Sequence, residues 1–438
     1  MILRILIKGG RIIDPSSHTD KVSDLLIEEG FIKAIDYNIE CNADSVIDAS
    51  GLWIIPGLVD MHCHLREPGY ESKETIYTGT RSAAAGGFTS VACMPNTQPP
   101  IDSKLMVEYI RLKAEKEAAV KVYPIGCITK GREGKELATF GMLKEAGAVA
   151  LSDDGDSVAN SRIMRLALQY ALSFDMPVIA HCEDKGLAAD GIINDGAVAT
   201  RLGLKGIPAA AEEVIVARDI VLAASAGGRL HIAHVSTAGS VEMIRQAKRL
   251  GINVTCETCP HYFSLTDEMA EGYNTAAKVN PPLRSPSDVE AIISGLKDGT
   301  IDVIATDHAP HDLSSKGDDI YNAAFGISGF ETALSVGITY LVDTGILEPM
   351  QFIAKMTHVP ADILGINAGQ LSIGLPADVA IVDPYAEYTV DTGKFISKGK
   401  NSPYDGMRLK GRVLYTIADG RYVLYGGQIA KGDGNDNR

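Results

Sequence analysis

Eight short apolar runs, rich in β-branched residues and separated by amphipathic stretches, fill the chain from residue 53 to residue 311. Strands that alternate with helices form parallel sheets, because each helix returns the chain to the starting edge of the sheet. Eight such units over about 300 residues match a closed (β/α)8 barrel. We therefore expect an α/β fold with a (β/α)8 (TIM) barrel, whose strands lie within 53–64, 88–96, 119–127, 148–155, 176–184, 229–237, 252–262 and 301–311.

The two ends of the chain differ from this middle part. Residues 1–52 and 368–427 contain short alternating apolar runs with Gly and Asp turns, and no long helical pattern. We expect both ends to assemble into one small, discontinuous β-sandwich domain beside a catalytic barrel domain over 53–367. The last residues, 428–438, are too polar to pack and are predicted to form a tail.

Composition excludes several classes of function. The 438 residues carry 41 Lys and Arg against 56 Asp and Glu, a formal net charge of −15, which argues against nucleic-acid or acidic-membrane partners. No run approaches the roughly 18 apolar residues of a membrane helix, and the amino-terminal run is interrupted by Arg4 and Lys8. Seven cysteines at low density fit reduced thiols, so we expect a cytoplasmic protein.

Residues of the types that bind metal ions lie near the carboxyl ends of five of the eight runs. They are His62 and His64 in the first run, Asp153 and Asp154 in the fourth, His181, His234 and Asp307. Side chains alternate along a strand, so the two histidines of the HxH pair share a face. The carboxyl ends of barrel strands converge on one face, where these groups would meet. A single histidine or aspartate at a strand end is more often a hydrogen-bonded or capping residue, so the inference depends on the joint pattern.

Four histidines with two or three carboxylates exceed the needs of one ion. The set suits two borderline divalent ions, for which zinc is the expectation, bridged by a carboxylate and a hydroxide.

Two nearby features are not assigned to this site. Cys256 and Cys259 form a CxxC pair without a second pair, which favours structural thiols. His231 is at odd spacing from His234, which favours packing over ligation.

Several longer motifs carry a family resemblance that extends nearly end to end. The chain resembles the type I dihydroorotases of the amidohydrolase superfamily, on the stretches GLVDMHCHLREPG (57–69), MPNTQP (94–99), AHCED (180–184), HVSTA (234–238), KVNPPLR (278–284), ATDHAPH (305–311) and SKGKNSP (397–403). This resemblance implies a reversible cyclisation of N-carbamoyl-L-aspartate to L-dihydroorotate plus water, the third step of de novo pyrimidine synthesis.

The resemblance also implies roles for individual residues. One zinc ion would be held by His62, His64 and Asp307 and the other by His181 and His234, with an aspartate of the fourth run bridging them. By position that aspartate is Asp154, with Asp153 as its close competitor. Asp307 would act as general acid and base, and the substrate contacts would be His64, Arg66, Asn96, Asn280, His311, Phe325 and Gly326.

Two features of the expected substrate site, Arg66 and a lid, are also supported by the residues themselves. Arg66 continues the alternation of His62 and His64, and its planar guanidinium matches a substrate carboxylate, although a surface salt bridge is the alternative. Residues 311–326 are rich in Gly, Ser and Asp and are predicted to form a lid over the site. For partners, the family resemblance favours a homo-oligomer and allows association with aspartate transcarbamoylase.

Two other functions stay open at this point. ETCPHY (257–262) resembles the equivalent stretch of hydantoinases and allantoinases, but those relatives generally bridge their metals with a carboxylated lysine where this chain has only aspartates. A non-catalytic dihydroorotase-like subunit that supports a partner enzyme is the third reading. Such subunits usually lack metal ligands, whereas this chain has the full set.

Overall fold

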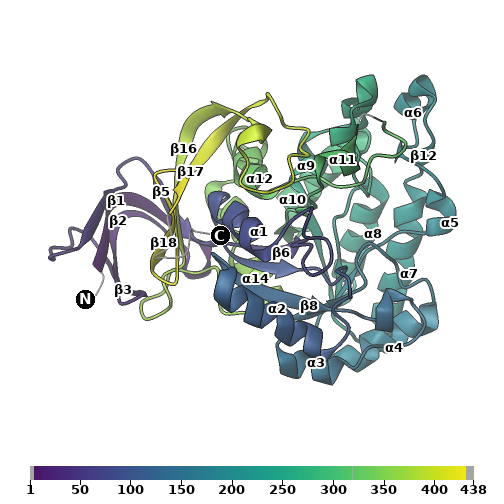
Figure 1. The fold of residues 1–438 in the computed structure, drawn as a ribbon, viewed down its shortest axis with the longest axis horizontal. Helices are drawn as coiled ribbons and strands as arrows, with labels where there is room; N and C mark the ends of the chain where they lie inside the picture. The colour runs from purple at the N-terminus through teal and green to yellow at the C-terminus, as the bar shows by residue number, and fades with distance from the viewer. Residues whose placement is uncertain (1–3, 318, 431–438) are drawn as a thin grey trace.

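The computed structural model describes residues 4–317 and 319–430 (Figure 1). Within that range an eight-stranded parallel sheet takes the order β15-β14-β13-β10-β9-β8-β7-β6. Each of the eight predicted runs contributes one strand, which confirms the predicted fold class. The strands are β6 (Leu58–Cys63), β7 (Phe88–Cys93), β8 (Lys121–Gly126), β9 (Ala150–Ser152), β10 (Val178–Ala180), β13 (Leu230–Ile232), β14 (Val254–Thr258) and β15 (Val303–Ile304).

Contacts between the first and last strands close this sheet into a barrel. A parallel bridge joins Cys63 to His308, and the backbone N–H of His64 donates to the His308 carbonyl at 2.9 Å. The buried Asp60 carboxylate accepts from the Thr306 backbone N–H at 3.0 Å and from its hydroxyl at 2.6 Å. The two edges are therefore joined at the level where the metal-binding motifs begin.

Helices surround the barrel, and their apolar residues recur at helical spacing. In α4 the buried residues are Met164, Ala167, Leu168 and Ala171, which form one stripe toward the strands. The longer α-helices are α1 (Ile76–Ala85), α2 (Lys104–Glu117), α3 (Phe140–Ala146), α4 (Ser161–Leu172), α7 (Ala210–Ala226), α8 (Ala238–Arg249), α10 (Pro286–Asp298), α12 (Phe330–Gly337) and α14 (His358–Leu364). Shorter ones are α5 (Lys185–Ala188), α6 (Ala197–Leu202), α9 (Pro260–Ser264), α11 (Leu313–Lys316) and α13 (Pro349–Ala354). No helix among the described residues combines the length and apolarity needed to cross a bilayer.

Strands from both ends of the chain form a second, nine-stranded sheet, seen beside the barrel in purple and yellow (Figure 1). Its order is β19-β18-β17-β16-β5-β1-β2-β3, with β4 paired to β1. Buried residues from both halves, among them Ile7, Ile27, Ile54 and Ile381, pack into one apolar cluster. The strands are β1 (Arg4–Asp14), β2 (Thr19–Glu28), β3 (Phe31–Asp36), β4 (Ser45–Asp48), β5 (Trp53–Pro56), β16 (Val379–Thr389), β17 (Arg408–Ala418), β18 (Arg421–Tyr425) and β19 (Gln428–Ile429).

The run at 53–64 is divided between the two sheets. β5 pairs with β1 and β16 in the nine-stranded sheet, and β6 begins the barrel after Gly57. The Gly57 backbone N–H donates to the Asp378 carbonyl at 2.9 Å, and a Cβ at this position would lie 2.1 Å from Thr89 Oγ1. Close packing, and not only sequence pattern, therefore sets where the strand changes sheets. The predicted domain boundaries stay predictions. Residues 428 and 429, predicted to belong to an unpacked tail, instead form β19 and pair with β18, and residues 431–438 lie outside the described range.

Replacing Gly57 by Ala should destabilise the protein. The new methyl would overlap the side chain of Thr89, and overpacking of this kind costs about 1–3 kcal/mol of unfolding free energy. Chemical denaturation would measure the loss. The double variant Gly57→Ala with Thr89→Ala should recover part of it, because two of the three overlapping atoms are removed. Purely additive losses in the double variant would contradict the proposed clash.

Candidate metal centre

Six of the predicted ligands lie together where five barrel strands end. His62 is in β6 and His64 follows it, Asp154 follows β9, His181 follows β10, His234 follows β13 and Asp307 follows β15. All six side chains are buried. The parallel strands end at one face of the barrel, so residues up to 245 positions apart in sequence meet there.

The Asp154 carboxylate lies between the histidines. Its Oδ1 is 3.3 Å from His62 Nε2, 3.5 Å from His181 Nδ1 and 3.8 Å from His234 Nε2. Its Oδ2 is 3.5 Å from His64 Nε2. Two sets of possible ligand atoms result, one with His62 and His64 and one with His181 and His234, each lying within 4.8 Å of one another and both including Asp154.

Asp153 and Asp154 have different environments. Asp153 Oδ1 accepts from the backbone N–H groups of Ile128 (2.9 Å) and Thr129 (3.0 Å), and its Oδ2 accepts from the Thr129 hydroxyl at 2.5 Å. Both oxygens of Asp153 are thus used to hold the loop after β8. Of the two aspartates, only Asp154 faces the histidine cluster.

Asp307 lies beside the HxH pair. Its Oδ1 is 3.0 Å from His64 Nε2 and 3.6 Å from His62 Nε2. Burial by itself would raise the pKa of this carboxyl, but the imidazoles of His62 and His64 outweigh it and hold the pKa well below the ordinary value. Asp307 is therefore ionised at neutral pH, with its Oδ1 beside the Nε2 atoms of the HxH pair.

Buried groups outside the cluster orient the two rings of the HxH pair. Glu257 Oε1 accepts from His62 Nδ1 at 2.5 Å, and its Oε2 is 3.3 Å from His231 Nε2. Asn96 Oδ1 accepts from His64 Nδ1 at 2.9 Å. These bonds place the protons on the Nδ1 atoms and turn both Nε2 atoms toward the cluster, as metal-binding histidines require. Burial by itself would raise the pKa of Glu257, but the imidazoles of His62 and His231 outweigh this effect and lower the pKa to about 2.

The other two histidines form a close pair. His181 Nδ1 is 2.8 Å from His234 Nε2, and the rings meet edge to face. His181 Nε2 is 3.6 Å from Glu183, which accepts a hydrogen bond from Asn280 Nδ2 at 3.0 Å. The structure therefore places predicted substrate residue Asn280 next to the second set of ligand atoms, through Glu183.

The donor set fits a divalent metal ion. Four imidazoles and two carboxylates are the ligand types that borderline divalent ions prefer. Among the described residues, buried His62 Nε2 and Asp154 Oδ1 have no hydrogen-bond partner. Buried polar atoms rarely stay unpaired unless an ion or a ligand completes them.

The remaining predicted substrate residues gather beside the cluster. Arg66 Nε donates to the Pro310 carbonyl at 3.3 Å, and His311 Nε2 donates to the Phe325 carbonyl at 2.8 Å. Burial, together with the neighbouring Arg66, lowers the pKa of His311 to about 3, so this imidazole is neutral at neutral pH. The Gly326 backbone N–H donates to the Lys278 carbonyl at 3.0 Å.

Three of the site residues have unusual backbone conformations. Arg66, His234 and Asp307 have φ angles of 61°, 34° and 45°, in the left-handed region that disfavours side chains. Each follows a barrel strand directly or within three residues. Strain of this kind is kept where the surrounding structure fixes a side chain for function.

Glu257 and Glu183 were not among the site residues predicted from the sequence. The CxxC cysteines on either side of Glu257, Cys256 and Cys259, are buried free thiols. The available signal was a charged residue inside a strand, VTCET, that otherwise contains only Val, Thr and Cys, since a buried glutamate needs a partner. Among the described residues, His231 belongs to neither set of ligand atoms, and its Nε2 lies 3.3 Å from Glu257 Oε2.

Comparisons with known proteins agree with this geometry. Residues 51–240 match the family model described as dihydro-orotase-like. Dihydroorotases of Acetivibrio thermocellus and Caldanaerobacter subterraneus subsp. tengcongensis are each 55% identical to the chain, over 96% of it and over 99% and 97% of their own lengths. The solved L-hydantoinase (dihydropyrimidinase) of Arthrobacter aurescens superposes with a TM-score of 0.88 at 26% identity, over 98% of both chains.

Replacing Glu257 by Gln should weaken metal binding. The amide keeps the size of the side chain but removes the charge that orients His62 and raises its basicity, and loss of such a partner typically costs about 10–100-fold in metal affinity. Competition with a chelating dye would give the Zn²⁺ dissociation constant. Asp219→Asn, a buried carboxylate paired with Arg218, is the matched control and should bind Zn²⁺ like the unmodified protein. Equal affinity in both variants would exclude the orienting role.

Proposed function

The chain belongs to the dihydroorotase family, and we propose that its buried histidine and aspartate cluster holds two zinc ions. The enzyme is a cyclic amide hydrolase that closes N-carbamoyl-L-aspartate to L-dihydroorotate with loss of water and runs the reverse hydrolysis. The observation that carries the metal proposal is the pair of ligand sets that share Asp154. Measuring zinc content and activity in both directions on the isolated chain tests it.

The proposed ligands divide between two sides of Asp154. His62, His64 and Asp307 would hold one ion, His181 and His234 the other, and Asp154 would bridge them. Zinc, when bound, lowers the pKa of a coordinated water toward about 7 and polarises a carbonyl oxygen. Hydrogen bonds to Glu257 and Asn96 fix the imidazole rings of His62 and His64 in the orientation that metal binding requires.

Asp307 is the proposed general base and acid. In hydrolysis its carboxylate takes a proton from the attacking water and delivers it to the ring nitrogen as the amide bond breaks; cyclisation reverses these transfers. The low pKa of Asp307 supports its ionised resting form. Its contact with His64 holds the carboxylate beside the ligand atoms.

The substrate carboxylate that takes no part in the reaction needs its own binding site. Arg66 is proposed to bind it, with Asn96, Asn280, His311 and the Phe325-Gly326 backbone completing the contacts. Holding a remote group orients the reacting carbon, which lowers the entropy cost of reaching the transition state. The His311 Nε2–H donates to Phe325 in this structure, so it would exchange that acceptor for substrate.

The rival functions receive less support. Relatives named dihydroorotase reach 55% identity, whereas the hydantoinase match is at 26%. A non-catalytic role is not favoured by a complete ligand set beside an ionised Asp307. Comparing hydrolysis of dihydroorotate, hydantoin and allantoin would separate the three functions.

Other aspects of the protein stay predictions supported by the sequence. These are the homo-oligomer, association with aspartate transcarbamoylase, the cytoplasmic location and the lid at 311–326. We also propose that 53–367 forms the catalytic domain and that 1–52 with 368–427 forms a β domain. Light scattering on the purified chain, alone and mixed with aspartate transcarbamoylase, would test the two assembly proposals.

Replacing Asp307 by Asn should abolish most activity in both directions. The amide keeps the shape but cannot accept the proton, and loss of a general base typically costs about 10²–10⁴-fold in kcat. Metal content is measured alongside, because Asp307 is also a proposed ligand. Full activity in a zinc-loaded variant would exclude the assigned role.

Replacing Arg66 by Lys should raise KM more than it lowers kcat. A lysine cannot reproduce the planar pair of N–H donors, and losing one charged hydrogen bond costs roughly ten- to a hundredfold in binding. Steady-state kinetics with dihydroorotate measures the effect. Lys73→Arg, which changes a neighbouring cation without removing its charge, should leave KM close to that of the unmodified enzyme. An unchanged KM in Arg66→Lys would contradict the proposed binding of the substrate carboxylate by Arg66.

A further inference from the structure

A segment of the carboxyl-terminal region leaves the nine-stranded sheet and lies against the barrel. It connects β16, which ends at Thr389, to β17, which begins at Arg408. We call residues 396–401 the brace. Ser397, Gly399 and Asn401 in the brace are buried. The brace overlaps SKGKNSP (397–403), one of the motifs that carry the family resemblance, but the sequence predicts no role in the site for it.

The side chain of Asn401 joins the two ends of residues 309–326, which carry the proposed substrate contacts His311, Phe325 and Gly326 and are called the substrate-binding loop below. Its Oδ1 accepts from the His311 backbone N–H at 3.0 Å and from the Ser328 hydroxyl at 2.9 Å. Its Nδ2 donates to the carbonyls of Ala309 at 3.1 Å and Gly326 at 2.9 Å. An amide has two donors and two acceptor positions, so every one of them is used. The bonds hold both ends of the predicted lid, 311–326, at a fixed separation.

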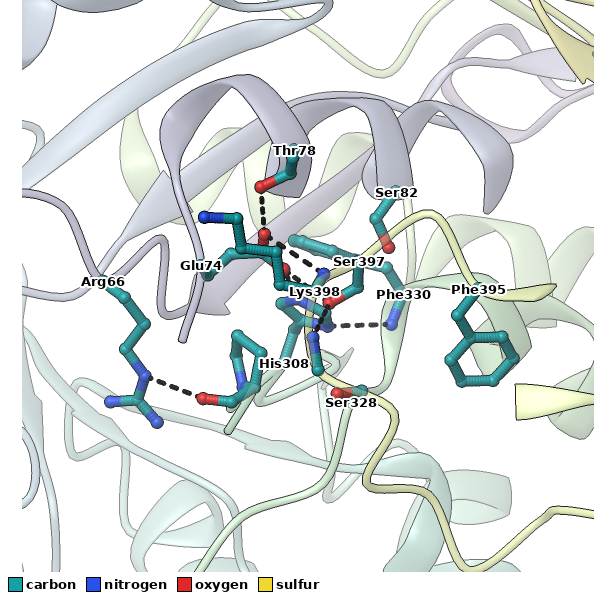
Figure 2. A network of polar contacts seen from close by, with 12 residues as sticks. Arg66, Glu74, Thr78, Ser82, His308, Ser328, Phe330, Phe395, Ser397 and Lys398 are labelled. Carbon is teal, nitrogen blue, oxygen red and sulfur yellow. Dashed lines mark hydrogen bonds and ion pairs between the residues drawn. The ribbon is translucent and has the colours of Figure 1, made fainter. Parts of the chain in front are cut away.

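The carboxylates of Glu74, which is buried, and Glu331, which is partly buried, anchor the other end of the brace. Glu331 accepts from the backbone N–H groups of Ile396 at 2.7 Å and Ser397 at 3.1 Å. Glu74 accepts from the Ser397 hydroxyl at 2.5 Å and from the hydroxyl of Thr78 in α1. Figure 2 shows Glu74 between Thr78 and Ser397, where α1 meets the brace.

Glu74 also connects the brace to the residue after Asp307. His308 Nδ1 accepts from the Gly329 backbone N–H at 3.1 Å, so the ring proton is on Nε2, which lies 3.4 Å from the Glu74 carboxylate (Figure 2). The ring also stacks on Phe330, with centroids 4.1 Å apart. The brace and the end of the eighth strand are thus held by one polar network.

We propose that the brace positions the substrate-binding loop, and that Asn401 is the positioning residue that sets where His311 and Gly326 lie relative to Asp307. The inference rests on the proposed function, in which His311 and Gly326 contact substrate. Among the described residues, the side chain of Asn401 bonds to Ala309, His311, Gly326 and Ser328, so it acts on the site through the loop. Without the amide, four buried polar groups lose a partner and the loop shifts to satisfy them.

The first experiment compares Asn401→Ala with Ser328→Ala in the zinc-loaded enzyme. Asn401→Ala should raise KM for dihydroorotate about ten- to a hundredfold, with a smaller fall in kcat, because displacement of binding groups by about 1 Å has effects of this size. Ser328→Ala removes one bond of the same group but leaves the loop bonds of Asn401 intact, and should change KM less than about twofold. Zinc content should be unchanged in both variants; loss of zinc, or an unchanged KM, in Asn401→Ala overturns the proposal.

A double-mutant cycle with His311→Ala separates positioning from a general structural effect. If Asn401 acts by placing His311, the double variant should raise KM by less than the product of the two single effects. A KM equal to that product overturns the proposal. If Asn401→Ala does not fold, Asn401→Asp replaces it, since it keeps the shape but lacks the two N–H donors. An unchanged KM in His311→Ala alone refutes the proposed substrate contact, whereas a raised KM there beside an unchanged KM in the Asn401 variant refutes only the brace.

Discussion

Closure of the barrel between β6 and β15 is the constraint on which the rest of the structure depends. β6 carries the HxH pair, and Asp307 follows β15, so these ligands become neighbours only when the first and last strands meet. The bonds from Asp60 to Thr306 and from His64 to the His308 carbonyl make this junction at one height of the barrel. A slip of one residue would turn the HxH side chains away from the centre.

Burying so many charged groups in one place requires each of them to be paired. An isolated carboxylate in an apolar interior costs several kcal/mol, and the pairing of Glu257 with two imidazoles offsets that cost. The same network fixes the rings before metal or substrate binds, so little reorganisation is needed during the reaction. Glu74 and Asn401 add further hydrogen bonds beside this network: Glu74 contacts His308 after the last strand, and Asn401 binds the loop that is proposed to bind substrate.

Local patterns in the chain predict the eight strands well, because alternation and turn residues act over a few neighbouring positions. The run at 53–64 shows the limit of such patterns. Its two halves are both apolar, and only packing of Gly57 against Thr89 and pairing with β16 assign them to different sheets. The choice between Asp153 and Asp154 is similar, since both follow the same strand and their different polar partners come from other segments of the chain.

The order and identity of the residues thus specify the barrel, the β-rich ends and the types of side chain that meet at the strand ends. Those properties depend on the spacing of residues along the chain, which can be read directly from the sequence. The partners of those side chains depend on contacts between segments that are far apart in sequence: Glu257 with His62 across 195 positions, and Asn401 with His311 across 90. Distances of that kind exist only after the chain has folded, because no local preference records which distant carboxylate or amide will fill a given hydrogen bond.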